Sequence, residues 1–428
     1  MLIKINPFIS GNPVSNENFI NRRVEVSRVV GRILNHGQSS AIIGEPRSGK
    51  TSLLQYLQTP EVSNALYGEQ EKNLLFSYVD TLTLGRQFTP SGFWKYVLEP
   101  VERAMGRELS PLKNSYLSCI KEDCGNFVLE RLFGQLYLTG RRLVLLLDEF
   151  DAFLNNEIFH QSEFYGGLRS LASRSKGLVL IIASRQSLSN LNLGTQEFNR
   201  TGSPYFNFLD EIPLRPFSQK SVDILLALGQ ERFTKKDNGF IHRLAGGHPY
   251  FLQTAAFELW EAYENEDLKF PEERCEIMGE NLYARAKQTL EDIWRLWTPV
   301  TKKAFGTVAF GEMPRLLAEK EFYIPNLLKK LPDYAPELKE LKRRGFIKDD
   351  EELESGYCVT AEVMLWFVAD ELLKALREDD SLGAWLHREE WDGVFTTGEK
   401  KQLTKAAKSV GWILRDGIEI FMQKWRVG

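Results

Sequence analysis

The stretch that decides the fold is Gly44-Glu45-Pro46-Arg47-Ser48-Gly49-Lys50-Thr51, which follows the pattern G-x-x-x-x-G-K-[ST]. The apolar run Ser40-Ala41-Ile42-Ile43 before it predicts a buried strand, and the run that begins at Ser52 predicts an amphipathic helix. A glycine-rich loop between a strand and a helix can point its backbone N–H groups at an anion. We therefore expect residues 44–52 to bind the phosphates of a nucleotide.

Two side chains of this loop have defined roles in the expected chemistry. Lys50 can reach the β- and γ-phosphates, and the hydroxyl of Thr51 can bind Mg²⁺. The expected ligands are therefore ATP or ADP together with Mg²⁺. The alternative is a chance match on a surface loop, which the strand before the motif and the helix after it make less favoured.

Two carboxylates follow a second buried strand further along the chain. Leu143 to Leu147 are all apolar, and Asp148 and Glu149 come directly after them. We expect Asp148 to hold Mg²⁺ and Glu149 to polarise the attacking water, a division inferred from their order alone. The alternative is a core strand that runs into a solvated acidic turn.

Apolar strands and helices alternate over the first half of the chain. Residues 74–79 and 178–183 read as further strands, and a last strand is expected over 210–214. This pattern predicts an α/β fold with a parallel sheet that helices flank on both faces. Ligands of such sheets bind at the carboxyl ends of the strands. Ser184 and Arg185 follow one strand, so we expect them to converge with the phosphate loop and Asp148.

The chain divides into four expected parts. Residues 1–215 are the nucleotide-binding core with an irregular leader, and 216–297 form a small helical domain. Residues 298–375 read as a winged helix, because a helix ending at Gly345 is followed by a strand, an acidic turn and a second strand. Residues 376–428 form a short helical tail.

Composition limits the classes of function. A net charge of −4 argues against a chain that coats nucleic acid by bulk charge. No apolar run approaches the ~20 residues that span a bilayer, and no secretory signal is visible. The four cysteines, at positions 119, 124, 275 and 358, read as ordinary reduced thiols. We expect a cytoplasmic protein that does not bind membranes.

The chain resembles the STAND-type NTPases, a branch of the AAA+-related P-loop ATPases, and the archaeal and bacterial ATPases that join a nucleotide-binding domain, a helical lid and a winged helix. The resemblance covers about residues 7–375. Arg22 lies in a stretch where the family carries a motif near the adenine and ribose, although Asn21 replaces the glycine of that motif. Arg185 stands where an arginine senses the γ-phosphate. Gly247-His248-Pro249 resembles the lid motif whose proline packs on the adenine.

The resemblance implies a slow, regulatory ATPase that acts as a switch in signalling or defence. ADP would hold it closed, and exchange for ATP would drive assembly into a homo-oligomer or onto a partner protein. Glu149, Asp148, Lys50 and Arg185 would carry the catalysis. Arg169 and Arg174 could reach a neighbouring subunit, and a solvated helix face explains them equally well.

Two other functions stay open. The first is a DNA-associated AAA+ ATPase in replication, transposition or segregation, with Lys339, Lys342, Arg343 and Arg344 on the DNA-reading helix of the winged helix. The acidic turn that follows would repel a DNA backbone, so nucleic acid is the less favoured partner. The second is a scaffold that binds a nucleotide and never hydrolyses it.

Overall fold

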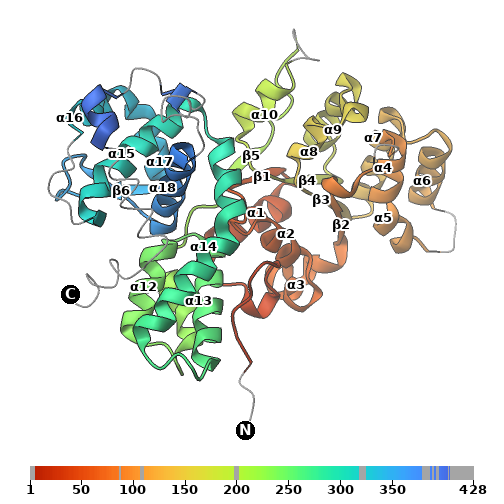
Figure 1. The fold of residues 1–428 in the computed structure, drawn as a ribbon. Coiled ribbons are helices and arrows are strands. Elements are labelled where there is room, and N and C mark those ends of the chain that lie inside the picture. The colour runs from red at the N-terminus through yellow and green to blue at the C-terminus, as the bar shows by residue number, and fades with distance from the viewer. Residues whose placement is uncertain are drawn as a thin grey trace. The chain divides into compact units, whose positions relative to one another are not determined.

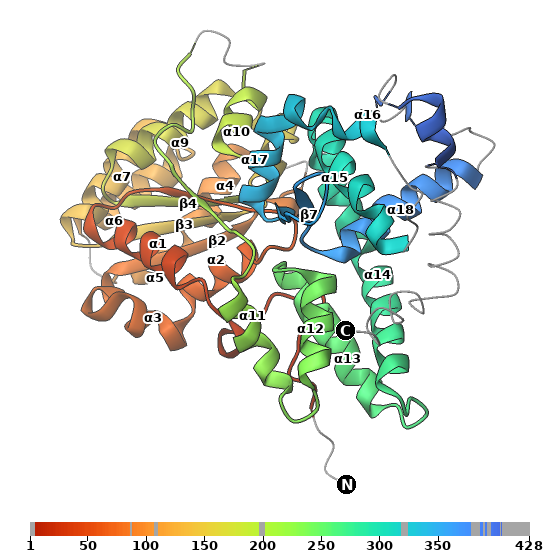
Figure 2. The same ribbon diagram turned by 90° about the vertical axis from the view of Figure 1, so that its left-hand side faces the viewer.

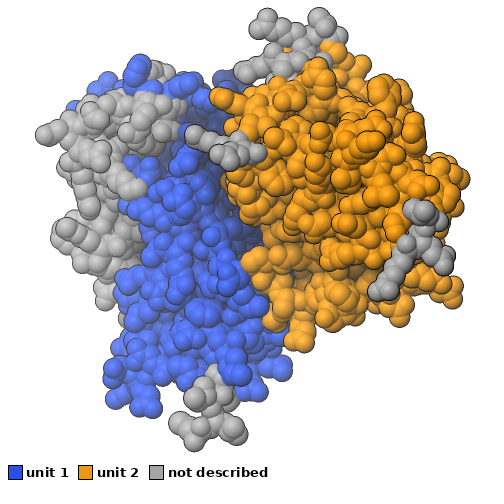
Figure 3. All heavy atoms as spheres, turned by 90° about the vertical axis from the view of Figure 1, so that its right-hand side faces the viewer, with its two compact units in different colours: residues 1–12, 46–48, 215–428 blue, residues 13–45, 49–214 orange. Residues whose placement is uncertain are grey.

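The computed structural model describes residues 5–85, 88–106, 110–196, 202–317, 324–377, 386–387, 390–391, 395–402 and 404. The chain forms two compact units, which Figure 3 colours separately. The core unit comprises Pro13–Glu45 and Gly49–Leu214, and the helical unit comprises Met1–Asn12, Pro46–Ser48 and Arg215–Gly428. In the described part of the chain, no helix has both the length and the apolar composition needed to cross a membrane.

A five-stranded parallel sheet is the centre of the core unit (Figure 1). Its strands are β1 (Ser40–Ile43), β2 (Leu74–Asp80), β3 (Arg142–Asp148), β4 (Leu178–Ser184) and β5 (Asp210–Pro213), in the order β2-β3-β4-β1-β5. Every residue of β4 is buried, as a strand covered on both faces requires. The predicted α/β fold is confirmed.

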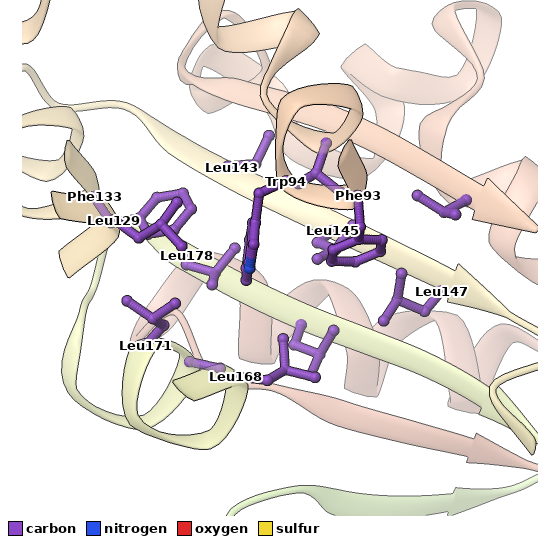
Figure 4. Close-up of a cluster of buried hydrophobic side chains, with 14 of the residues drawn as sticks. Phe93, Trp94, Leu129, Phe133, Leu143, Leu145, Leu147, Leu168, Leu171 and Leu178 are labelled. Atoms are coloured by element: carbon purple, nitrogen blue, oxygen red, sulfur yellow. The ribbon is translucent and has the colours of Figure 1, made fainter. Parts of the chain in front are cut away.

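Helices cover both faces of this sheet. One face packs against α1 (Arg23–Asn35), α2 (Lys50–Gln58) and α3 (Pro60–Tyr67). The other face packs against α4 (Pro90–Val97), α5 (Glu99–Ala104), α6 (Pro111–Lys121), α7 (Asn126–Leu138), α8 (Asp151–Leu154), α9 (Ser162–Arg174) and α10 (Leu188–Gly194). Alternate leucines of β3 point into this second layer, where Figure 4 shows Trp94 and Phe133 packed against Leu143 and Leu178.

The helical unit begins with four helices that succeed one another in sequence. They are α11 (Gln219–Leu226), α12 (Lys235–Ala245), α13 (Pro249–Glu264) and α14 (Pro271–Leu296). The leader, which we expected to belong with residues 1–215, packs within this unit. Phe8 stacks on Phe233 with ring centroids 5.4 Å apart, and Asn6 Nδ2 donates to Glu261 Oε1 over 2.7 Å.

The remainder of the helical unit has the element order that the sequence indicates (Figure 2). It comprises α15 (Pro299–Leu317), α16 (Pro325–Leu328), α17 (Ala335–Arg344), β6 (Ile347–Asp349), β7 (Tyr357–Val359) and α18 (Glu362–Arg377). Strands β6 and β7 pair antiparallel, and α17 ends at Gly345 in a left-handed conformation with φ of 79°. The winged-helix assignment stays a prediction. Most of the expected tail, residues 376–428, lies outside the described residues.

Pro216 packs so closely against two positions of the helical unit, Gly247 and Gly345, that only glycine fits at them. A Cβ added to Gly247 would lie 2.9 Å from Pro216 Cβ, and one added to Gly345 would lie 2.3 Å from Pro216 Cγ. Polar contacts join other elements of this unit, since Arg243 Nε of α12 lies 3.2 Å from Glu362 Oε2 of α18 and the Tyr283 hydroxyl of α14 donates to Asp370 of α18 over 2.9 Å. Helices α12 and α14 are therefore fixed to α18.

Candidate functional site

The glycine-rich loop, residues 44–49, joins β1 to α2, as the sequence predicts. Gly44 N donates to Ser184 O over 3.1 Å, which fixes the start of the loop to the end of β4. Gly49 is the N-cap of α2 with φ of 95°, a conformation that glycine adopts without steric cost. Lys50 Nζ donates to the carbonyl oxygens of Gly44 and Glu45, each over 3.0 Å. The ammonium group thus lies inside the curve of its own loop.

Lys50 is a buried cation with carboxylates nearby. Its side chain is only 4% exposed. Burial lowers the pKa of Lys50, the charge of Glu149 partly offsets this effect, and the guanidinium of Arg185 lowers the pKa further. A buried charge is costly unless opposite charge compensates it. An anion bound in this loop would supply that compensation.

Asp148 ends β3 in a buried position and has two fixed hydrogen bonds. The Tyr78 hydroxyl donates to Asp148 Oδ2 over 2.9 Å, and Glu149 N donates to Asp148 Oδ1 over 2.9 Å. Burial and the neighbouring carboxylate raise the pKa of the Tyr78 phenol, so the phenol keeps its proton and remains a donor. The Asp148 carboxylate and the Thr51 hydroxyl are the hard oxygen ligands that Mg²⁺ prefers.

Glu149 has an unusual backbone and an ion pair. Its φ is 48°, in the left-handed region that few residues other than glycine adopt. The Thr81 hydroxyl donates to Glu149 O over 2.5 Å and holds this turn. Arg185 lies 2.9 Å (Nη2) and 3.1 Å (Nε) from Glu149 Oε2. The carboxylate is therefore bound by the arginine that the sequence places at the next strand end.

Asp151 fixes the carboxyl end of β4. Its Oδ2 accepts a hydrogen bond from Arg185 N over 2.9 Å, and its Oδ1 accepts one from Ser184 Oγ over 2.8 Å. Sequence reasoning did not assign roles to Tyr78, Thr81 and Asp151. The third acidic residue of Asp148-Glu149-Phe150-Asp151 is a signal that could have indicated Asp151. Tyr78 and Thr81 give no such signal, because strand pairing alone brings them to Asp148.

Arg22 lies in the core unit at the start of α1. It is the N-cap of that helix with φ of 65°, and its Nη1 lies 3.2 Å from Glu25 Oε1. Asn21 before it is also left-handed, with φ of 63°, a conformation that asparagine adopts more readily than most residues other than glycine. Burial lowers the pKa of Arg22 although Glu25 opposes the shift.

Thr51 and Ser52 lie in the first turn of α2 in the core unit, whereas the expected nucleotide-binding residues Pro46, Arg47, Ser48 and Pro249 belong to the helical unit. Arg47 has φ of 57°, and its guanidinium lies 4.6 Å from the centroid of the Tyr250 ring. Arg47 also donates to Gly11 O over 3.1 Å. Pro249 is the first residue of α13, directly before Tyr250. Arg47 therefore contacts the start of the helix that carries the expected adenine-packing proline.

A model of the AAA-like domain matches residues 10–272, which is more than half of the chain. No curated protein matches the sequence. Among solved structures, the Walker-type ATPase PABY2304 of Pyrococcus abyssi is 16% identical, with 82% of this chain and 96% of that chain covered and a TM-score of 0.48. The ORC2 protein of Aeropyrum pernix, in ADPNP-ADP complexes, is 15% identical, with coverage of 83% and 94% and a TM-score of 0.47. Cdc6p of Pyrobaculum aerophilum is 13% identical, with coverage of 84% and 99% and a TM-score of 0.35.

Proposed function

This chain belongs to the family of AAA-like domains, and on that premise we propose that it binds ATP with Mg²⁺ and hydrolyses it as a regulatory switch. The observation that carries the proposal is the position of four charged side chains. Lys50, Asp148, Glu149 and Arg185 lie at or just after the carboxyl ends of β1, β3 and β4, which are neighbours in the sheet. Nucleotides bind at this edge of open α/β sheets.

Each of these side chains suits one task in phosphoryl transfer. The backbone N–H groups of the loop and the Lys50 ammonium would bind the β- and γ-phosphates. Asp148 and Thr51 would hold Mg²⁺, which when bound neutralises phosphate charge. Glu149 would orient the attacking water and polarise it. Tyr78 would keep the Asp148 carboxylate in one orientation, because it donates to Oδ2.

The Arg185–Glu149 ion pair gives the switch a physical basis. With the guanidinium 2.9 Å from Glu149 Oε2, the carboxylate is already engaged and is a poor acceptor for a water proton. A terminal phosphate carries more negative charge than a carboxylate and would compete for the arginine. ATP would then free Glu149, whereas ADP, which lacks that phosphate, would leave the pair intact.

The finer proposal is a STAND-like protein that changes conformation and assembles when ATP replaces ADP, in signalling or defence. Its support is the order of the parts, since helices α11 to α14 follow the core and the helix–strand–strand–helix segment follows them. The contact of Arg47 with Tyr250 supports it too, because a loop residue expected to bind nucleotide touches α13. Such a contact can couple the nucleotide to a helical domain.

The DNA-associated function has less support from the charges of α17. Lys342 forms an ion pair with Asp349, and Arg343 Nη2 lies 2.7 Å from Glu340 Oε1. Arg344 lies over the ring of Trp297, 5.9 Å from its centroid. Cations that already have partners within the chain gain less from DNA phosphates. The same pairs suit a helix that packs in a regulatory domain.

Identification of any nucleotide that co-purifies with the protein tests the proposal. The chain is purified without added nucleotide and denatured, and the released compounds are identified and quantified. About one ADP per chain would support a closed switch. An empty site with rapid turnover of added ATP would support a cycling machine, and duplex DNA would then be tested. A protein that releases nothing and neither binds nor hydrolyses ATP would refute the proposal.

A further inference from the structure

The end of α6 brings two cysteines together. Cys124 N donates to Cys119 O over 2.8 Å, and Asp123 N approaches Ile120 O at 3.4 Å. This pair of hydrogen bonds, with Glu122 as the C-cap, is the Schellman pattern of helix ends. The pattern places the side chain three positions before the cap against the side chain two positions after it. In this helix both of those side chains are thiols.

The backbone distance suits a disulfide. A hydrogen bond of 2.8 Å from Cys124 N to Cys119 O holds the two Cα atoms within about 6.7 Å of each other. Disulfides join cysteines whose Cα atoms are roughly 4.4–6.8 Å apart. The two thiols also shift each other's pKa, which requires that they lie close together. The two sulfurs are therefore neighbours in the folded chain.

Contacts from α4 hold the turn that carries the second thiol. Asp123 and Cys124 both have left-handed backbones, with φ of 50° and 55°. Lys95 Nζ lies 3.0 Å from Asp123 Oδ1, and Ser91 Oγ donates to the same oxygen over 3.3 Å. A turn fixed by these bonds keeps the thiols together without a covalent link.

We propose that Cys119 and Cys124 form a reversible disulfide when the protein meets hydrogen peroxide. The Cys124 thiolate attacks one peroxide oxygen, so that an S–O bond forms, the O–O bond breaks and hydroxide leaves. The Cys119 sulfur then attacks the Cys124 sulfur, so that the S–S bond forms and the S–O bond breaks. The hydroxide ions take up the two thiol protons. Two thiols are oxidised and one peroxide is reduced to two waters.

Cys124 is the attacking residue of the pair for two reasons. It is 5% exposed, whereas Cys119 is fully buried at 0%. The neighbouring Cys119 thiol lowers the pKa of Cys124, and the Lys95 ammonium acts in the same direction against the effect of burial. The neighbouring Cys124 sulfur and burial raise the pKa of Cys119, as expected for the thiol that stays protonated until the second step.

The two other cysteines are internal controls. Cys275 and Cys358 are also buried. Burial raises the pKa of Cys275 to about 12 and that of Cys358 to about 11. A thiol with a raised pKa stays protonated and reacts slowly with peroxide, whereas the pKa of Cys124 is lowered. Both should stay reduced under conditions that oxidise the pair in α6.

The test is a thiol count on the full chain. The native protein is treated with dilute hydrogen peroxide, the peroxide is removed, and the protein is denatured in an excess of a maleimide. We expect two of the four cysteines to be labelled and a peptide map to contain a Cys119–Cys124 disulfide, which a dithiol reductant reverses. Four labelled cysteines, or oxygen adducts on Cys124 with Cys119 still labelled, would overturn the proposal.

Matched variants separate the pair from general oxidation. Cys119→Ser keeps a hydrogen-bond donor beside Cys124 and should give oxygen adducts on Cys124 and no disulfide. Cys275→Ser should still form the Cys119–Cys124 disulfide. Loss of the disulfide in this variant would show that Cys119 does not pair with Cys124. Thermal unfolding of both variants establishes that they are folded. If a variant does not fold, the peptide map of the unsubstituted protein decides whether the Cys119–Cys124 disulfide forms.

Discussion

Two groups of charged side chains in this molecule differ in burial. At the strand ends of the core unit, Lys50 is 4% exposed and Asp148 is 2% exposed. On α17, the side chains of Lys342 and Arg343 are 49% and 45% exposed, and each has an acidic partner. Sequence alone presented both groups as candidates for binding phosphate.

The comparison shows which charges need a ligand. Exposed ion pairs contribute only about 0–1 kcal/mol, so the pairs on α17 are explained as ordinary surface chemistry. Buried charges cost free energy unless they are compensated, so a fold that retains several of them at one edge has a functional reason. The strand ends are therefore the better candidate for the nucleotide site.

The largest effect expected at the strand ends is on turnover. Glu149→Gln removes the group that polarises water, so we expect kcat for ATP to fall by about 10²- to 10⁴-fold. ATP binding should be retained, because the substitution also frees Arg185. Steady-state hydrolysis and equilibrium binding measure the two effects. Glu130→Gln, on the exposed face of α7, is the control, and unchanged turnover in Glu149→Gln would show that this carboxylate is not catalytic.

The next effect concerns discrimination between nucleotides. Arg185→Ala removes charged hydrogen bonds of about 1.5–3 kcal/mol to the terminal phosphate, so ATP affinity should fall roughly 10- to 150-fold. ADP lacks that phosphate and should bind within about 3-fold of its original affinity. Titration with each nucleotide gives both values, with Arg131→Ala as the surface control. An equal loss for ATP and ADP would assign Arg185 a structural role.

A smaller effect is expected for the hydrogen bond that orients Asp148. Tyr78→Phe should raise the Mg²⁺ concentration needed for half-maximal ATP hydrolysis by about 10-fold, because partners of metal-binding residues tune affinity by this amount. Tyr67→Phe is a matched control, since the Tyr67 hydroxyl donates to Leu57 O within the same unit. If both variants have the same Mg²⁺ requirement as the original protein, Asp148 does not depend on Tyr78 for metal binding.

The smallest effect is expected on α17. Replacing Lys342 and Arg343 together by glutamate should change ATP hydrolysis by less than about 2-fold, because both side chains are exposed and their pairs are weak. Neither form should bind a DNA duplex at low salt. Duplex binding by the original protein that falls steeply with salt, and its loss in the double variant, would favour the DNA-associated function.

Much of the fold could be predicted from sequence because its signals are local. The apolar strands are continuous runs such as Leu143 to Leu147, and the loop has a motif with a known mechanism. The rule that ligands bind at strand carboxyl ends was enough to group Lys50, Asp148 and Arg185. The roles assigned to them stay predictions.

The contacts around Glu149 could not be predicted, because they depend on strand register and on one backbone angle. Asp80 pairs with Asp148 across β2 and β3, and this register sets Tyr78 beside the same carboxylate. The positive φ of Glu149 turns its side chain to Arg185. Likewise, nothing in the composition of the leader indicates that Phe8 packs on Phe233 in the helical unit.

Thermal unfolding with and without Mg·ATP tests the central claim most directly, namely that the buried charges at the strand ends form a nucleotide site. At 100 times Kd, a ligand stabilises the folded state by about 2.7 kcal/mol. For a unit of this size the unfolding midpoint should rise by roughly 5–10 °C. The unfolding midpoint of Lys50→Ala should not rise with Mg·ATP, whereas that of the exposed control Lys72→Ala should rise as much as in the original protein. An equal rise in Lys50→Ala would contradict the account.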